Sequence, residues 1–587
     1  MLEEKRGLDR NQLIGFLLIG AILIGASFWS QSQLPKEPVA TQTTPVEETA
    51  LPASPKKQTV PILVSADTSW KPAIVVLENE DLLLEWTTAG AQLVKAELKK
   101  YKNWQGSPLR VVDNNHLLAL QGVVPSSAWA FVSQKTSDST IVLSATKEGQ
   151  SLAWTFTLPS TGYDLRWSLV GQGLKGTEAT LAWEQQGLRH EKSQSTEALA
   201  TTIYAWETQE DDDVSLSDGS DDADETSQAA WVAFKQQYFS SILTRDGGWS
   251  KATFATTSPS EQDTLHTRFL EATLSLPVQT GALSTSGTWY IGPNKYHTLA
   301  DYNQHFDVII PFGWGIFGWI ARYGVVPIFD FLDGFNLNYG LIIFLMALLI
   351  KLVLLPLTFS SYKSMAKMRV LKPEIDEINE KFKDQDSMKK QQAVMALYSK
   401  AGVNPLGGCI PQLLQFPILI AMFRFFPASI ELRQESFLWA RDLSSYDSIF
   451  TLPFEIPFYG DHVSLFTILM AVSTYFYTKL NNTMTPTSGS DMMRQQMLII
   501  QYVMPFMLLF FFNNYSSGLS YYYFIANVIT FGQQYSMRFF INEEAIHAKI
   551  QDNKAKGGKK GGFQERLQGV MEQQKEAGNR RVRRNAK

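Results

Sequence analysis

Long apolar runs are the feature of this 587-residue sequence that most limits what it can fold into. The C-terminal half contains five of them, each long enough, or nearly so, to cross the ~30 Å hydrocarbon core of a bilayer as a helix. They cover residues 339–359, 409–430, 463–478, 497–512 and 519–537. A sixth run, Leu13–Trp29, is uncharged and follows Lys5, Arg6 and Arg10. It lacks a clear small-residue cleavage site, which favours an uncleaved anchor over the alternative of a signal peptide. We therefore predict a polytopic protein with six transmembrane helices.

The distribution of Lys and Arg orients these helices, because positive charge collects on the cytoplasmic side of a membrane. The 361–405 loop contains nine such residues and the segment after Phe539 is also rich in them, whereas the 431–462 loop contains two, Arg433 and Arg441. Both chain ends are therefore predicted to be cytoplasmic. Residues from about 31 to 338 then lie in the periplasm of a diderm bacterium, and the chain lies in its inner membrane.

The periplasmic segment carries a different pattern. Residues 31–57 are rich in Pro, Thr, Ala and Glu, which is typical of an extended tether. From 58 to 305 apolar and polar residues alternate, as in Leu165, Trp167 and Leu169, in Trp154 and Phe156, and in Val94, Ala96 and Leu98. Alternation of period two without long helical patterns predicts strands that are buried on one face. We expect a large antiparallel all-β sandwich domain here.

An acidic run from Glu210 to Glu225 interrupts this region. Its spacing does not match the alternating ligands and central glycine of an EF-hand loop, so we interpret it as a solvated, flexible loop rather than a calcium site. The single cysteine, Cys409, excludes an internal disulfide and a cysteine-rich metal site. No phosphate loop, H-x-x-x-H pair or nucleophile elbow is present, so the sequence predicts no cofactor, no metal and no enzyme activity.

Residues 306–540 are predicted to form the membrane core, with an amphipathic interfacial helix at 312–335. Within this core Lys351 lies about eight residues, or roughly 12 Å, from the cytoplasmic end of its helix. A charge at that depth costs about 2.5 to 3.5 kcal/mol. Snorkelling to a headgroup is the alternative, but the side chain is short for that distance. We infer a hydrophilic groove with Lys351 in it, and the following polar residues as its lining: Gln412, Gln415, Thr467, Ser473, Gln501, Tyr522, Tyr523 and Asn527. Each of these taken alone is also typical of interhelical hydrogen bonding.

Two cytoplasmic segments carry further candidate sites. The 360–405 loop predicts two charged helices, 365–382 and 388–400. They form either a solvated hairpin or a docking surface for clients, with Met365, Lys367, Met368 and Lys372, whose methionines we expect to be exposed. The tail 541–587 ends in Arg580, Arg581, Arg583 and Arg584. Positive-inside topology explains part of this charge, and the rest suits contact with anionic lipid or with the RNA of a ribosome.

An ordered set of motifs in the membrane half resembles the YidC, Oxa and Albino family of insertases. The motifs are Leu354 to Thr358, Ser364 to Met368, Leu371 to Pro373, Ala396 to Tyr398, Asn404 to Cys409, Gln415 to Ile418, Glu431 to Arg433, Ser517 to Leu519, and Tyr522 with Tyr523. The resemblance covers 289–534, with a weaker similarity over 78–101. It implies a five-helix core with a hydrophilic groove open to the cytoplasm and lipid, a cytoplasmic hairpin that engages clients, and a periplasmic β-supersandwich. Lys351 stands where the family usually has arginine, so the charge is kept and the bidentate fork is lost. Ala347 is apolar where some relatives are polar.

These observations together predict insertion and folding of inner-membrane proteins through the groove, alone or with the Sec translocon. Partners are then nascent membrane-protein clients, the translocon, the lipid bilayer and the ribosome. The alternative is a small-molecule or ion transporter with a midplane charge, although no repeated halves with matching broken helices are present.

Overall fold

The computed structural model describes residues 70–382, 387–404, 410–457, 459–484 and 491–555. The predicted anchor Leu13–Trp29, the tether 31–57 and the four tail arginines lie outside them. The domain limits given above therefore stay a prediction.

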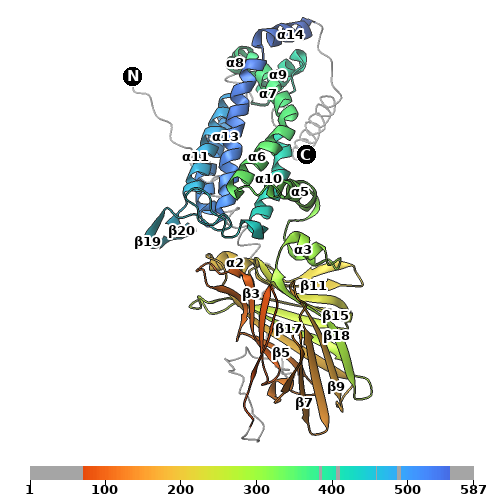
Figure 1. Ribbon diagram of the computed structural model, residues 1–587. Helices are drawn as coiled ribbons and strands as arrows, with labels where there is room; N and C mark the ends of the chain where they lie inside the picture. The colour runs from red at the N-terminus through yellow and green to blue at the C-terminus, as the bar shows by residue number, and fades with distance from the viewer. Residues whose placement is uncertain (1–69, 383–386, 405–409, 458, 485–490, 556–587) are drawn as a thin grey trace, which may run out of the picture. The chain divides into compact units, whose positions relative to one another are not determined.

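The first part of the described chain is built from three antiparallel sheets, which confirms the predicted all-β class (Figure 1). One sheet has the order β1-β2-β3-β4, from Ile74–Glu78, Leu82–Thr87, Gln92–Lys102 and Pro108–Asp113. The second has the order β13-β16-β17-β10-β5, from Asp222–Thr226, Ala252–Thr257, His266–Pro277, Glu178–Leu188 and His116–Gln121. The third has the order β12-β11-β14-β15-β18-β9-β8-β7-β6, from Asp212–Ser215, Thr202–Glu207, Ala229–Lys235, Phe239–Trp249, Leu283–Pro293, Asp164–Gln172, Gln150–Thr157, Thr140–Lys147 and Val132–Ser137.

The predicted alternation produces the core between these sheets. In β9, Leu165, Trp167 and Leu169 are buried while Arg166 is exposed, because successive side chains of a strand point to opposite faces. Val94 departs from the prediction, since it is half-buried and its neighbour Leu93 is buried instead. The β2–β3 register shifts between Glu85 and Trp86, opposite this point, and such an irregularity changes which residues face the core.

The acidic run is wrong as a flexible loop, because it contains two strands. β12 ends the nine-stranded sheet and β13 ends the five-stranded sheet. Charged side chains on an edge strand keep its free backbone groups from pairing with another chain. The carboxylates are also partly engaged: Asp221 forms an ion pair with Arg268 at 3.1 Å. Acidic composition alone did not reveal the strands, because β-propensity is low for Asp and the sheet edge supplies the pairing.

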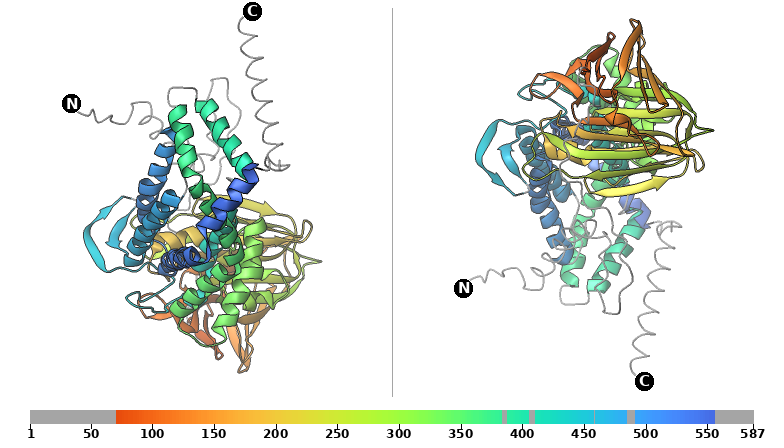
Figure 2. Two further views of the ribbon diagram at one scale, coloured as in Figure 1. Left: turned by 90° about the horizontal axis from the view of Figure 1, so that it is seen from above. Right: turned by 90° about the horizontal axis from the view of Figure 1, so that it is seen from below.

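The second part is helical, with a short hairpin. Its elements are α3 (Tyr296–Ala300), α4 (Gly315–Ile320), the π-helical η3 (Ala321–Val325), α5 (Val326–Asp333), α6 (Tyr339–Val353), α7 (Leu355–Val370), α8 (Lys372–Lys381), α9 (Ser387–Ala401), α10 (Ile410–Ala428), β19 (Phe450–Ile456), β20 (Gly460–Val463), α11 (Leu465–Met484), α12 (Asp491–Phe512), α13 (Ser517–Phe540) and α14 (Glu543–Ala555). Another short helix, α2 (Gln194–Ala200), belongs to the β part. Helix α13 packs against α6, α10 and α11, and α14 packs against α7 and α9. Figure 1 shows α7, α8, α9 and α14 at one end of the helical part and β19–β20 near the other, and Figure 2 shows β19–β20 projecting sideways.

Length and apolar composition single out one described helix as able to cross a membrane, Gly315–Asp333, although we predicted that segment to lie in the interface. The bent pair α6 and α7 makes a second span if both are taken together. Helices α10 and α12 contain shorter apolar stretches, Leu414–Ala428 and Leu498–Phe512. Polar residues inside α11 and α13 lower their mean hydropathy. The number of six spans therefore stays a prediction.

Candidate functional site

Lys351 lies near the end of α6, at the point where the chain bends by 60° into α7. The bend follows from Pro356, which has no N–H to donate and whose ring clashes with the carbonyl of residue i−4 in a helix. Near the bend, the Lys351 carbonyl accepts a hydrogen bond from Nε2 of Gln533 on α13 at 3.1 Å. A side chain from a third segment thus caps the backbone at the bend.

The ammonium of Lys351 is buried, with 6% of the residue exposed. Its Nζ donates to Oε1 of Gln415 on α10 at 3.2 Å. Among the described residues Lys351 forms no ion pair, and this bond to Gln415 is the one hydrogen bond of its three donors. The structure therefore brings together Lys351 and Gln415, two of the predicted groove residues, and adds Gln533. The hydrophilic groove that we expected around Lys351 stays a prediction.

Other predicted groove residues lie elsewhere. Tyr522 is 4% exposed and its ring packs 5.5 Å from that of Phe426, with Tyr523 beside it at 6.0 Å. Gln501 is buried on α12. The side chain of Gln412 lies outside the described residues. The tyrosines thus belong to an aromatic cluster rather than to the polar contacts of Lys351.

Asn527 belongs to a polar seam between α11 and α13. Its Nδ2 donates to Ser473 Oγ and to Thr474 Oγ1, each at 3.0 Å. Two similar contacts lie along the same pair of helices: Thr467 Oγ1 with Ser520 Oγ at 3.1 Å, and Gln534 Nε2 with Asn481 Oδ1 at 3.1 Å. The partners are 53 residues apart in all three layers, Thr467–Ser520, Thr474–Asn527 and Asn481–Gln534. For Asn527 the interhelical alternative is therefore the better description.

A sequence signal for this seam was available and was missed. The seam residues repeat every seven positions on both helices, at 467, 474 and 481 and at 520, 527 and 534. A spacing of seven keeps residues on one face of a helix that packs against a partner at a shallow angle. Asn527 was predicted to line the groove because its polarity was considered alone, without the seven-residue repeat to which it belongs.

The candidate residues of the predicted cytoplasmic hairpin lie in or around a small helical core. Buried residues from α7, α8, α9 and α14 cluster there, including Leu371, Ile375, Tyr398 and Ile550. Met368 is 4% exposed and belongs to this core, so its expected exposure is wrong. Met365 and Lys367 are half-buried and Lys372 is exposed. Hydropathy could not show that Met368 is buried and Met365 only half-buried, because α14, the fourth helix of the core, comes from a distant part of the chain.

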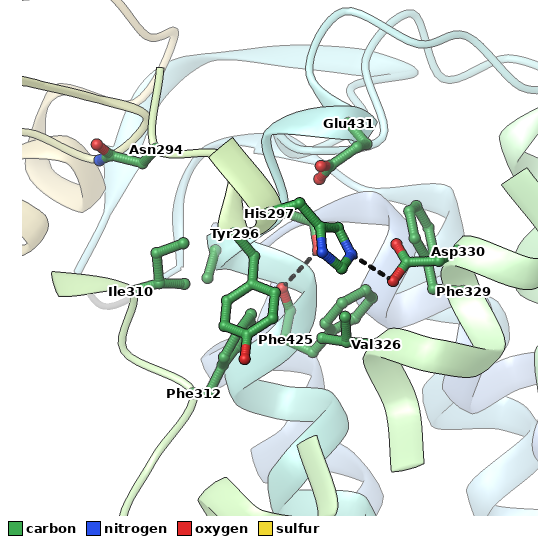
Figure 3. Close-up of a pocket in the computed structure, with 12 residues that line it drawn as sticks. Asn294, Tyr296, His297, Ile310, Phe312, Val326, Phe329, Asp330, Phe425 and Glu431 are labelled. Carbon is green, nitrogen blue, oxygen red and sulfur yellow. Dashed lines mark hydrogen bonds and ion pairs between the residues drawn. The ribbon is translucent and has the colours of Figure 1, made fainter. Parts of the chain in front are cut away.

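A small pocket lies near the C-terminal end of α10 (Figure 3). It has a volume of about 20 Å³, enough for roughly one water molecule. His297 of α3 points to Asp330 of α5 there, with Nε2 2.7 Å from Oδ2, and Glu431 lies at the rim. Burial raises the pKa of the Glu431 carboxyl. A pocket of this volume has no room for a ligand. The paired side chains that line it connect α3 to α5.

Comparison with known proteins accounts for both parts of the chain. Residues 74–325 match the family described as the YidC periplasmic domain, and residues 331–544 match the 60Kd inner membrane protein family. The membrane protein insertase YidC of Parabacteroides distasonis is 37% identical over 629 residues, covering 97% of this chain and 98% of its own. The chain belongs to the YidC membrane protein insertase family.

Two more YidC relatives match at nearly full length. The membrane protein insertase YidC of Amoebophilus asiaticus is 34% identical over 96% of this chain and 98% of its own. That of Porphyromonas gingivalis strain ATCC 33277 is 36% identical over 97% and 98%. The predicted family and inner-membrane location are thereby confirmed. These YidC proteins are named for insertion and not for a covalent reaction, and the transporter alternative gains no support from them.

Proposed function

We propose that this chain inserts membrane proteins by exposing a client's polar flank to the contacts around Lys351 while the client's apolar segment enters lipid. Six spans with both ends in the cytoplasm place α7, α8, α9 and α14 on the cytoplasmic side. The observation that carries the proposal is the buried ammonium of Lys351, which among the described residues has a single neutral partner, Gln415.

The charge of Lys351 suits an acidic or polar client group. An ammonium has three donors, and Gln415 accepts one hydrogen bond. A carboxylate at 4 Å gains about 4 kcal/mol at an effective dielectric constant of about 20. That gain offsets the penalty of about 2.5 to 3.5 kcal/mol for a charge deep in a bilayer. The client therefore supplies a counter-ion that α6, α10 and α13 do not.

No nucleotide is needed in this scheme, because transfer of the client's apolar segment into lipid supplies the free energy. The protein lowers the barrier for the polar flank, since each backbone group kept hydrogen-bonded avoids a cost of several kcal/mol in hydrocarbon. Gln415 and Gln533 already bond polar groups at the bend and are able to exchange partners with the client.

The cytoplasmic helices suit the first contact with a client. Lys372 is exposed on α8, and Met365 and Lys367 are half-buried on α7, so a client meets a mixed apolar and basic surface. Met368 does not take part, because it is inside the core of this hairpin. We further propose the Sec translocon as a partner for larger clients, and the ribosome or anionic lipid as the partner of the tail arginines.

Reconstitution in liposomes tests the proposal. Purified protein is expected to insert a short single-span client with an acidic flank faster than protein-free liposomes do. The same liposomes, loaded with small solutes and ions, are expected to show no protein-dependent flux. Insertion at the protein-free rate would overturn the insertase proposal, and solute flux would favour the transporter.

A further inference from the structure

The hairpin β19–β20 presents apolar side chains that no other described part of the chain covers. Phe450 is 61% exposed, Phe454 60% and Ile449 50%. The hairpin projects sideways from the helical part in Figures 1 and 2, at the end away from α7, α8, α9 and α14. Helix α11 begins at Leu465, two residues after β20 ends. The hairpin therefore ends next to the first turn of this helix.

The hairpin is fixed to the helices by a buried side chain. Asn513, which is 0% exposed, donates from Nδ2 to the carbonyls of Tyr459 and His462 at 2.8 Å each. Its Oδ1 accepts from the backbone N–H of Ser464 at 3.0 Å. The ring of His462 in turn stacks on Tyr446 with centroids 3.7 Å apart. These contacts fix β20 to the helices, and β19 is attached to β20 through the pairs Phe450–Val463, Thr451–His462 and Ile456–Gly460.

The apolar surface of the hairpin continues onto α12. The ring of Tyr459 packs 5.2 Å from Phe510, and Phe510 packs 4.9 Å from Phe506, which is 63% exposed. Exposed apolar residues extend further along α12, including Val503 at 53%. A helix of an inner-membrane protein with such a surface faces lipid, and the hairpin extends this surface at its end.

We propose that β19–β20 is an interfacial anchor whose Ile449, Phe450 and Phe454 enter the boundary between headgroups and acyl chains of the periplasmic leaflet. The anchor rests on the proposed topology, which makes this end of the bundle periplasmic. Phenylalanine side chains on a rigid support bind such a boundary by burying apolar area.

The chemistry of the hairpin limits how deep it lies. Residues 449–463 contain no Lys or Arg, and their charged residues are Glu455, Asp461 and, when protonated, the buried His462. A two-stranded sheet has unpaired outer edges, which need water or headgroups and exclude the hydrocarbon centre. Pro453 has no backbone N–H, so β19 has one donor fewer that needs a partner. The hairpin therefore suits the headgroup region of the bilayer and not its hydrocarbon core.

Spin labels at single cysteines test this anchor in the full chain reconstituted in liposomes. The background variant is Cys409→Ser, which removes the single cysteine. Labels follow Phe450→Cys and Phe454→Cys on the hairpin, with Glu455→Cys as the matched control on the same strand. A label after Val503→Cys reports on α12, about 14 Å from its end at Phe512. Collision with oxygen, which dissolves in lipid, is compared with collision with a water-soluble nickel chelate.

The anchor predicts that the labels at 450 and 454 favour oxygen and lie about 5 to 10 Å below the headgroup surface. The label at 455 favours the chelate, and the label at 503 is deeper than all three. If 503 is deep while 450 and 454 favour the chelate, the anchor is overturned and the span α12 stands. If 450 and 454 are shielded from both reagents, a protein covers the hairpin and the anchor is again wrong. If 503 also favours the chelate, the proposed topology itself fails.

Discussion

Replacing Asn527 with leucine separates a seam residue from a groove residue. The change removes the two hydrogen bonds from Nδ2 to Ser473 Oγ and Thr474 Oγ1, and it keeps a side chain of similar size between α11 and α13. Asn527 is half-buried, and leucine is of similar size, so the substitution is not expected to create a cavity. If Asn527 serves the seam, the variant loses stability and keeps its insertion activity.

The size of the loss follows from what the change leaves behind. Hydrogen bonds between membrane helices average about 0.6 kcal/mol, so two of them give about 1.2 kcal/mol. Neither hydroxyl is orphaned, because Ser473 Oγ and Thr474 Oγ1 also donate to the Met470 carbonyl at 2.9 and 2.8 Å. The penalty for a buried unpaired donor is thus avoided, and the loss stays at about 1 kcal/mol.

The measurement is the free energy of unfolding in mixed micelles, with Thr474→Val as the partner in a double-mutant cycle. We expect a coupling energy of about 0.6 kcal/mol between positions 474 and 527. Client insertion by Asn527→Leu is expected at the wild-type rate once folded protein is matched. Lost insertion at unchanged stability would refute the seam and return Asn527 to the groove.

Two predictions concern the rest of the fold. His116 is half-buried, its Nε2 accepts from Trp183 Nε1 at 3.0 Å and its buried Nδ1 has no partner among the described residues, so desolvation lowers the pKa of its imidazole to about 3. The unfolded chain takes up this proton near pH 6.5 and the folded chain does not. Stability is therefore complete above pH 6.5 and falls by about 1.4 kcal/mol per unit as the pH decreases toward 3. Thermal unfolding against pH is expected to be less acid-sensitive in His116→Gln, and an unchanged profile would contradict the assignment. A Cβ at Gly340 would lie 2.1 Å from ring atoms of Phe437, so Gly340→Ala is expected to cost about 1 to 3 kcal/mol in unfolding experiments, whereas Gly532→Ala, with open space at its Cβ, is not.

The sequence predicted the β part well because burial repeats every second residue there. Leu165, Trp167 and Leu169 alternate with polar residues in the chain and face the core in the structure. It failed at β12 and β13, since those strands owe their pairing to the sheet edges and not to their own composition. The prediction buried Val94 in place of its neighbour Leu93. The cause is a register shift between β2 and β3, which depends on how the two strands pair and is not visible in either strand alone.

The candidate site was predicted in part. The sequence alone shows a lysine inside an apolar run. Gln415 was predicted to line the same groove because it is a polar residue within another predicted span, and the structure places it in contact with Lys351. Gln533 was missed because its partner is the backbone carbonyl of Lys351 on another helix, and a contact between a side chain and a distant backbone group leaves no local pattern. Met368 appeared exposed because the helix that covers its cluster, α14, is encoded almost 180 residues later, and contacts of that range leave no local pattern.

The charge at position 351 is the centre of the proposed mechanism, and one insertion assay tests it directly. Proteoliposomes containing the wild type, Lys351→Arg or Lys351→Glu are given two single-span clients that differ only in an acidic or a basic flank. Arginine keeps the charge, so the account predicts wild-type rates for both clients. Glutamate reverses it, so insertion of the acidic client falls while the basic client is spared. Equal rates for both clients with both variants, at matched amounts of folded protein, would contradict an electrostatic role for Lys351.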